Sequence, residues 1–287
     1  MAADKEIFVN KFIKTAAAAG GAVLLAKGLD NRLEVTHYYV KSPKIPREFN
    51  GFKIVQISDL HSDNPPCLTA EIRHEAPDII VSTGDLVHHR GSYMRMTELC
   101  GRLVKIAPVY AVSGNHDLWR GDYGEFENAL SEAGVKTLNS EHIVLEKGGD
   151  KISLYGIADP FAVTTENIKK FMDREYARLP ESDGYKILLF HRANWLDYFK
   201  DKPFDLIISG HMHGGQVRIP MLGGFISPRS SWSDKKRILF PKYFGGRYDE
   251  YGRVMIVSRG LGNPMPIPRI FNRPELVVIT LEHTDEI

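Results

Sequence analysis

The sequence has few cysteines and almost no net charge, and each lack excludes a class of protein. Cys67 and Cys100 are too few for a disulfide framework and lack the paired spacing of a structural zinc site, so we expect two small apolar core residues. The 37 Lys and Arg residues balance 36 Asp and Glu residues, which leaves no broad positive field for nucleic acid; we expect no nucleic-acid partner. An apolar content of 43% excludes a disordered chain.

Long hydrophobic runs are also missing, and the apolar run near the amino terminus is short. Thr15 to Ala26 is about a dozen residues between Lys14 and Lys27, whereas a spanning helix needs roughly 20. The run fits a signal-peptide core or an interfacial helix better than a membrane span. Asn10 to Lys14 resembles the stretch after the arginine pair of a twin-arginine export signal, but the arginines are absent.

Two interpretations of this segment stay open. It is either a membrane-proximal anchor or decayed signal, or an Ala-rich helix packed on the domain. The first leads us to expect association with a membrane surface, with the extracytoplasmic side slightly favoured and the cytoplasmic side left open.

What the sequence does have is a set of short, mostly apolar, β-type runs, each followed by polar side chains that bind metals. The runs are IVQIS before Asp59 and His61, IIVST before Gly84 and Asp85, VYAVS before Asn115 and His116, ILLF before His191, and LIIS before His211 and His213. In open α/β sheets, ligands bind in the crevice outside the carboxyl ends of the strands. We therefore expect these side chains to meet at one place.

The spacing of strand-like and helix-like segments indicates a mostly parallel sheet from Phe52 to Asp117. Helices are expected at residues 68–75, 93–105, 123–133 and 164–179. Residues 135–157 indicate antiparallel strands with a hairpin turn at Lys147 to Asp150. Strands are also expected at 33–40, 254–258 and 276–281. We expect residues 1–49 to form an amino-terminal helix and connector, and residues 50–287 to form one catalytic domain.

Residue type and spacing indicate which metals fit. Asp59 and His61 lie two residues apart, as do His211 and His213, so each pair points the same way from an extended strand end. The mixed nitrogen and oxygen donors suit Zn, Fe, Mn, Co or Ni better than Ca or a soft copper site.

Asp85 is a carboxylate that can bridge two divalent ions, and Asn115 offers a neutral carbonyl oxygen. Two ions about 3.5 to 4 Å apart acidify a bridging water and stabilise the attacking and leaving oxygens of a displacement at phosphorus. His116 would then donate a proton to the leaving oxygen, with Asp117 next to it as a group that orients it. The pattern predicts hydrolysis of phosphate esters.

Each block also has an ordinary explanation. Gly84 with Asp85 is a common turn, and Asn115 to Asp117 could cap backbone groups. The segment Gly210 to Gly215 is harder to explain by packing, because two histidines bracketed by glycines at a strand end have no packing purpose. The joint occurrence of the blocks in order favours the metal site.

The blocks resemble the five motif blocks of the calcineurin-like metallophosphoesterase superfamily. The residues that carry this resemblance are Asp59-Leu60-His61, Gly84-Asp85, Gly114-Asn115-His116-Asp117, His191 and Gly210-His211-Met212-His213. The tail Ser258 to Gly262, with Arg273-Pro274-Glu275 beyond, resembles the bacterial membrane-associated branch. That branch includes Tat-exported phosphoesterases and relatives of UDP-2,3-diacylglucosamine hydrolases.

The resemblance implies a four-layer αββα sandwich of two mixed sheets flanked by helices, with a dinuclear metal site at the strand ends. It assigns Asp59, His61, Asp85 and His213 to one metal, and Asp85, Asn115, His191 and His211 to the other. Asp85 bridges, a metal-bridging hydroxide attacks the phosphorus, and His116 is the proton donor. Relatives in this branch often have Pro-Asp near the fourth block, where this chain has Arg192-Ala193-Asn194, so substrate contacts are expected to differ there.

The segment from Val217 to Gly246 is rich in Gly, Pro and aromatics and mixes apolar residues with cations. This composition would suit a lipid-linked or nucleotide-lipid phosphoester, or a loop folded over its own hydrophobic cluster. Two interpretations other than an enzyme stay open. The first is a non-catalytic member of the fold that acts as a membrane-peripheral binding or scaffold module. The second is a peripheral membrane protein whose metal site is structural. A non-catalytic member would usually have lost ligands, and none is missing.

His88 and His89 are expected to be solvated loop histidines.

Overall fold

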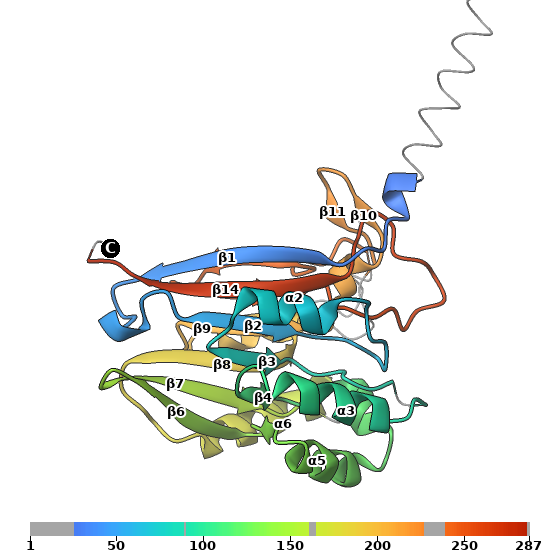
Figure 1. Ribbon diagram of the computed structural model, residues 1–287. Coiled ribbons are helices and arrows are strands. Elements are labelled where there is room, and N and C mark those ends of the chain that lie inside the picture. Colours follow the sequence, from blue (N-terminus) through green and yellow to red (C-terminus); the bar gives the residue numbers. More distant parts are fainter. Residues whose placement is uncertain (1–25, 89, 161–164, 227–238, 286–287) are drawn as a thin grey trace, which may run out of the picture.

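The computed structural model describes residues 26–88, 90–160, 165–226 and 239–285, and its main body is two six-stranded sheets packed face to face (Figure 1). The strand order is β1-β14-β2-β3-β4-β5 in the first sheet and β12-β13-β9-β8-β7-β6 in the second. Both sheets contain parallel and antiparallel pairs.

The first sheet carries three of the predicted helices. Its strands are β1 (Glu34–Ser42), β14 (Glu275–His283), β2 (Lys53–Ile57), β3 (Ile79–Ser82), β4 (Val109–Ala111) and β5 (Lys136–Thr137). Helices α2 (Leu68–Glu75), α3 (Met94–Leu103) and α5 (Tyr123–Glu132) lie on its outer face, and α4 (Asn115–Trp119) follows β4 directly. The helices predicted near these positions are confirmed. In α2 the residues that face inward, Leu68, Ile72 and Glu75, follow the helical repeat.

The second sheet consists of β12 (Gly246–Glu250), β13 (Arg253–Val257), β9 (Leu206–Gly210), β8 (Tyr185–Arg192), β7 (Asp150–Ile157) and β6 (Glu141–Lys147). Helix α6 (Thr165–Arg178) and the 3-10 segment η2 (Ala193–Phe199) pack on its outer face. Lys147 pairs with Asp150, so the predicted hairpin turn is confirmed. Thr164, the predicted cap of α6, lies outside the described residues.

The prediction of an antiparallel region over residues 135–157 is wrong at its start. Strand β5 pairs in parallel with β4 in the first sheet, with Lys136 opposite Tyr110. Only β6 and β7 pair with each other as antiparallel neighbours. The reason is the crossover through α5, which returns the chain beside the strand it left, as right-handed βαβ units do.

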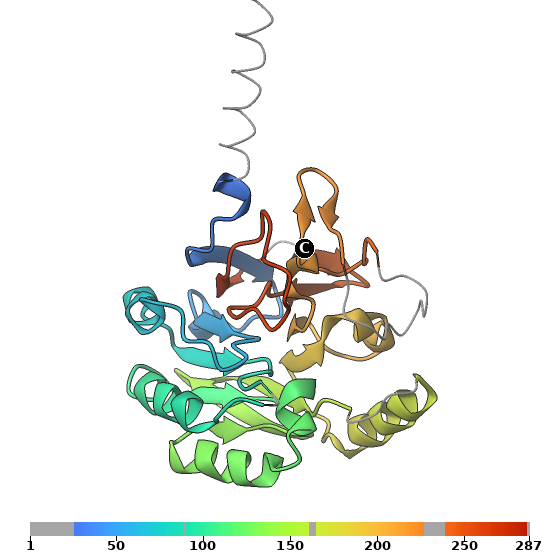
Figure 2. The same cartoon turned by 90° about the vertical axis from the view of Figure 1, so that its right-hand side faces the viewer.

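Three separate apolar cores show that the molecule has four layers. One lies between the first helices and the first sheet, the second between the two sheets, and the third between the second sheet and α6 with η2. Successive residues of β2 divide between two of these cores, since Ile54 faces the other sheet and Val55 faces the helices. Figure 2 shows helices on both outer sides of the sheets. The predicted αββα sandwich is confirmed.

The amino-terminal part that is described belongs to the first sheet. The strand predicted at residues 33–40 is β1, which pairs in parallel with β14 from Glu34 to Ser42 as the edge strand. The division at residue 49 stays a prediction. Residues 15–25 of the apolar run lie outside the described residues, and no helix within the described part of the chain is long and apolar enough to cross a membrane.

The segment predicted to be irregular contains a small hairpin of β10 (Arg218–Ile219) and β11 (Gly223–Gly224). Residues 227–238 of this segment lie outside the description.

The two cysteines differ from each other: Cys100 is buried in the core as expected, whereas Cys67 is exposed. Cys67 precedes α2 with a φ of 68°, at a turn on the surface.

Candidate metal centre

The predicted metal ligands lie at the carboxyl ends of strands from both sheets. Loops after β2, β3 and β4 of the first sheet carry Asp59, His61, Asp85 and Asn115, and the ends of β8 and β9 of the second sheet carry His191, His211 and His213. All of them are buried, with exposed fractions of 0 to 6%. Because β2 to β4 run parallel, as do β8 and β9, the donors of each sheet gather at one edge.

The first group of donors consists of Asp59, His61 and His213. The Nε2 atoms of His61 and His213 are 3.1 Å apart. Asp59 Oδ1 lies 3.5 Å from His213 Nε2 and 3.9 Å from His61 Nε2. The ligand atoms of these three residues lie close enough together to bind one ion.

The second group is centred on His191. Its Nε2 lies 3.1 Å from Asn115 Oδ1, 3.1 Å from His211 Nδ1 and 3.3 Å from Asp85 Oδ2. Asp85 Oδ2 is also 3.7 Å from His61 Nε2, so this carboxylate connects the two groups. The side chains thus lie in groups that could hold ions, and the assignment of each residue to one metal stays a prediction.

The hydrogen bonding of His191 tests whether a cation fits. Its Nδ1 lies 2.7 Å from the carbonyl oxygen of Thr83, which only accepts, so Nδ1 carries the proton. In the neutral ring Nε2 then presents a lone pair to the Asp85 and Asn115 oxygens, which are acceptors too. Acceptors that converge in a buried place need a positive charge between them. The donors present fit a divalent metal ion.

The pKa directions of the other three histidines fit rings that offer lone pairs, and that of His191 shows that its surroundings favour a positive charge. Burial lowers the pKa of His61 to about 3 and those of His211 and His213 well below the usual value, so these rings carry the free lone pair that a ligand needs. Burial also opposes a charge on His191, but the Asp85 carboxylate outweighs it and raises the pKa to about 10. Burial raises the pKa of Asp59 to about 6.

Comparison with known proteins identifies the family to which this chain belongs. The profile of the calcineurin-like phosphoesterases matches residues 52–215. The chain belongs to the calcineurin-like phosphoesterase family. These enzymes typically bind a dinuclear metal centre, and the chain is a metal-dependent phosphoester hydrolase.

Three relatives are similar along most of their length. The uncharacterized metallophosphoesterase YkuE of Bacillus subtilis is 29% identical over 94% of this chain and 93% of its own. The phosphodiesterase YaeI of Escherichia coli is 28% identical over 80% of this chain and 82% of its own. The UDP-2,3-diacylglucosamine pyrophosphatase LpxG of Chlamydia muridarum is 24% identical over 95% of this chain and 98% of its own.

In this phosphoesterase the ligand loops have a strained backbone. Five of the predicted ligands, Asp59, His61, Asp85, His211 and His213, have φ between 48° and 73°, a region that residues other than glycine rarely adopt. Such backbone strain persists only where surrounding contacts hold the residues in place, and it is found most often at functional sites. Here the loops hold each other, since the Asp59 N–H donates to Gly84 O and the His61 N–H donates to Asp85 O.

Two glycines make the close approach of these loops feasible. A Cβ on Gly114 would collide with the Asp85 carboxylate and backbone nitrogen, and a Cβ on Gly84 would lie 2.6 Å from Gly114 N. Gly84 also has a φ of 94°. Both positions therefore require glycine.

Asp117 caps backbone groups, which is the alternative that the sequence left open for Asn115 to Asp117. Its carboxylate accepts backbone N–H groups from Asp85 and Gly114, both at 2.8 Å, and from Val87 at 3.0 Å. It thus connects the loops after β3 and β4, and the orientation of His116 by Asp117 stays a prediction. Burial raises its pKa to about 7.

His116, the predicted proton donor, lies at the rim of the centre and is only partly buried. Its backbone N–H donates to Asp85 Oδ1 at 2.7 Å. Its ring centroid is 4.7 Å from that of His61 and 4.8 Å from that of Trp119. A nitrogen of the ring lies close enough to His61 and Asp85 to join them in a ligand group.

His88 was expected to be a solvated loop residue, and the structure places it beside the centre instead. It is half-buried, and its ring centroid is 5.2 Å from that of His116. Its backbone N–H donates to Ser62 Oγ, which fixes the loop. No local pattern marks such a contact in the sequence. His89 lies outside the described residues.

The tail block Ser258 to Gly262 supports the Asp59 loop. The Leu261 N–H donates to Ser58 O at 3.0 Å, and the Gly262 N–H donates to Asp59 O at 2.8 Å. Arg269, which the sequence did not single out, is buried and donates to the carbonyl oxygens of Arg259 and Gly262. The block therefore holds a ligand loop from behind.

The departure after the fourth block is explained by an ion pair. Arg192 is buried beside His191, and its Nε lies 2.6 Å from Asp159 Oδ2. The charge is thus neutralised inside the protein, which fixes the end of β8.

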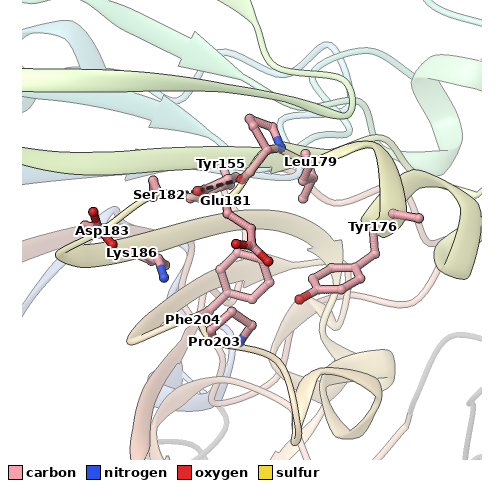
Figure 3. Close-up of a pocket in the computed structure, with 11 residues that line it drawn as sticks. Tyr155, Tyr176, Leu179, Glu181, Ser182, Asp183, Lys186, Pro203 and Phe204 are labelled. Carbon is pink, nitrogen blue, oxygen red and sulfur yellow. Dashed lines mark hydrogen bonds between the residues drawn. The ribbon is translucent and has the colours of Figure 1, made fainter.

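A separate cavity of about 700 Å³ lies at the opposite end of the second sheet (Figure 3). Tyr176 and Phe204 line it, and Tyr155 there donates a hydrogen bond to Ser182. It is also lined by Lys186, which precedes His191 by five positions along β8. None of the predicted ligands lines this cavity, so it is not part of the metal centre.

Proposed function

We propose that this phosphoesterase hydrolyses phosphodiester or pyrophosphate bonds in a lipid-linked substrate, using two divalent metal ions. The observation that carries the proposal is the convergence of acceptor atoms around His191 and Asp85. One ion would be held by Asp59, His61, Asp85 and His213, and the other by Asp85, Asn115, His191 and His211.

The chemistry follows from the donors and from the groups at the rim. Two divalent ions bound there supply Lewis acidity toward a phosphoryl oxygen and a water nucleophile at neutral pH. His116 stands at the rim, where its imidazole donates a proton to the leaving oxygen. Its backbone N–H, bonded to Asp85, keeps the ring next to the centre.

Two observations support a lipid-linked substrate. The relative named UDP-2,3-diacylglucosamine pyrophosphatase aligns with 95% of this chain. The segment after His213 also combines a cation with apolar surface, since the Arg218 guanidinium lies 5.8 Å from the centre of the Phe244 ring. Phosphate and acyl chains need those two kinds of surface side by side.

A substrate panel tests this function. Full-length protein, freed of metal with a chelator, is loaded in turn with Mn, Fe, Zn, Co or Ni. It is then assayed with p-nitrophenyl phosphate, bis-p-nitrophenyl phosphate, UDP-2,3-diacylglucosamine and UDP-N-acetylglucosamine. We expect metal-dependent turnover of the diester and of the acylated sugar nucleotide, and faster turnover of the acylated compound than of its soluble counterpart.

Asp85→Asn removes a charge from the proposed bridge and should abolish turnover. Asp173→Asn on the outer surface of α6 is the matched control and should leave it unchanged. Folded, metal-loaded protein that turns over none of the compounds would favour the non-catalytic scaffold. Equal rates on the acylated and soluble sugar nucleotides would remove the lipid-linked part of the proposal alone.

A further inference from the structure

The β10–β11 hairpin exposes large apolar side chains at its tip. Met221 is 103% exposed and Leu222 is 67% exposed. From Ile219 to Pro228 the sequence has no charged residue. Exposed turns usually carry polar residues along with Gly and Pro, so an uncharged tip with two protruding apolar side chains is unusual for a turn in water.

The base of the hairpin is firmly held next to the metal centre. The carbonyl oxygen of Gly215 accepts the N–H of Ile226 at 2.9 Å, and the Phe225 N–H donates to Val217 O at 2.8 Å. Asn272 donates to the carbonyl oxygens of His213 at 2.7 Å and of Gln216 at 3.1 Å. The hairpin is therefore a rigid extension of the loop that carries His213.

The described chain begins beside this hairpin. The Phe271 N–H donates to Gly28 O at 2.7 Å, and the Arg218 N–H donates to Ile270 O at 2.9 Å, so Gly28 and Arg218 contact neighbouring residues of one segment. Figures 1 and 2 both show the hairpin and the start of the described chain on the same side of the molecule. The residues that precede Gly28 in sequence are the apolar run between Lys14 and Lys27.

More exposed apolar side chains lie around the hairpin base. Phe240 is 41% exposed, and its N–H donates to Phe225 O at 3.0 Å. Ile267 is 39% exposed, and its carbonyl oxygen accepts a hydrogen bond from Gln216. The apolar surface thus continues from the tip toward the centre.

We propose that the β10–β11 hairpin docks on a phospholipid bilayer and inserts Met221 and Leu222 into its interfacial region. A bilayer fits better than a protein groove, because Met221 and Leu222 protrude from an uncharged tip and because the described chain, which follows an apolar run in sequence, begins beside it. The docking does not rest on the proposed substrate. It would place the metal centre close to the bilayer surface, since the hairpin base is bonded to the His213 loop.

An environment-sensitive label tests the contact. In full-length protein with Cys67→Ser, Leu222→Cys is labelled with a nitrobenzoxadiazole dye. Vesicles of phosphatidylethanolamine and phosphatidylglycerol are added. The control is Val144→Cys, because Val144 is 45% exposed on β6 at the far edge of the second sheet. We expect a blue shift and brighter emission at position 222 and no change at position 144.

Two results would overturn the proposal. The label at position 222 could stay water-like while the protein sediments with vesicles, which would mean that another part of the chain binds the bilayer. It could instead report an apolar environment before vesicles are added, which would mean that the protein itself covers the tip.

A second measurement does not depend on a label. The double variant Met221→Ser, Leu222→Ser should lower the vesicle partition coefficient about tenfold, because two large apolar side chains no longer enter the interface. Val144→Ser should leave the coefficient unchanged. Turnover of bis-p-nitrophenyl phosphate should be unchanged in both variants. An unaltered coefficient in the double variant would contradict the docking, whatever the outcome of the substrate panel.

Discussion

At the scale of single residues, the decisive feature is a set of acceptors that face one another in a buried place. His191 shows it most clearly, because its Nδ1 donates to Thr83 O and its Nε2 faces the Asp85 carboxylate, which raises the pKa of the ring to about 10. No arrangement of neutral side chains satisfies all of these atoms at once. The site therefore favours a positive charge, and the family membership of the chain points to metal ions as the source of that charge.

His116→Gln should separate proton donation from metal binding. Loss of a general acid typically costs about 10² to 10⁴ in rate, so we expect that loss in kcat for an alkyl phosphodiester. A p-nitrophenyl leaving group needs little protonation and should suffer a smaller loss. Metal content, measured by elemental analysis, should equal that of the unaltered protein. A fall in metal content would instead make His116 a ligand, which its closeness to His61 and Asp85 also allows.

At the scale of elements, the ligand loops are shaped by bonds from other parts of the chain. Asp117 joins the loops after β3 and β4, and the Ser258 to Gly262 block holds the loop after β2. Because each loop has a strained backbone, it needs these supports to keep its ligands in place.

Asp117→Asn should therefore destabilise the fold. One carboxylate oxygen is replaced by an NH₂ group that faces a backbone N–H, so a buried donor loses its partner, at a cost of about 1–3 kcal/mol. Urea unfolding followed by circular dichroism measures this loss. The control is Asp285→Asn, which alters an exposed pair with Arg47 and should cost much less. Equal unfolding midpoints for the two variants would contradict the role of Asp117.

Glu275 makes the corresponding link between β14, β1 and the tail block. It accepts the Arg259 N–H and the Thr36 hydroxyl, and its Oε1 lies 3.1 Å from Arg259 Nη2. Glu275→Gln leaves the Arg259 guanidinium with Glu34 as its remaining carboxylate partner among the described residues and should cost about 3 kcal/mol. Glu282→Gln, in an exposed pair with Lys41 on the same two strands, should change the free energy of unfolding by less than about 1 kcal/mol. The comparison uses the same urea titration.

At the scale of the whole molecule, the metal centre joins the two sheets. Its donors come from the loops after β2, β3 and β4 on one side and from the ends of β8 and β9 on the other. Ions bound there would stabilise the packing of the two sheets, in addition to the apolar core between them.

Metal addition should accordingly raise the melting temperature of the chelator-treated protein. A ligand at a hundredfold excess over its Kd stabilises the native state by about 2.7 kcal/mol for each site. Differential scanning calorimetry with and without Mn or Zn measures the shift, and a chelator should reverse it. Asp85→Asn should show a much smaller shift, while Asp173→Asn should behave like the unaltered protein. An identical shift in the Asp85 variant would mean that the stabilising ions bind elsewhere.

The sequence by itself determined the features that depend on neighbouring residues. Each β run and the ligand after it are adjacent in the chain, so the strand ends, the helices on the first sheet and the hairpin at Gly148 could be predicted. The residues to be brought together were also predictable, because the carboxyl ends of parallel strands share one edge.

Only the tertiary structure decided what depends on contacts between distant parts of the chain. Asp117 bonds backbone groups about 30 residues away, the Gly262 N–H bonds Asp59 O about 200 residues away, and His88 packs beside His116. Two further features also depend on contacts between distant parts of the chain. These are the pairing of β5 with β4 and the position of the β10–β11 hairpin beside the start of the described chain. Such contacts join groups that are far apart in the chain, and they impose no periodic pattern on the residues around them.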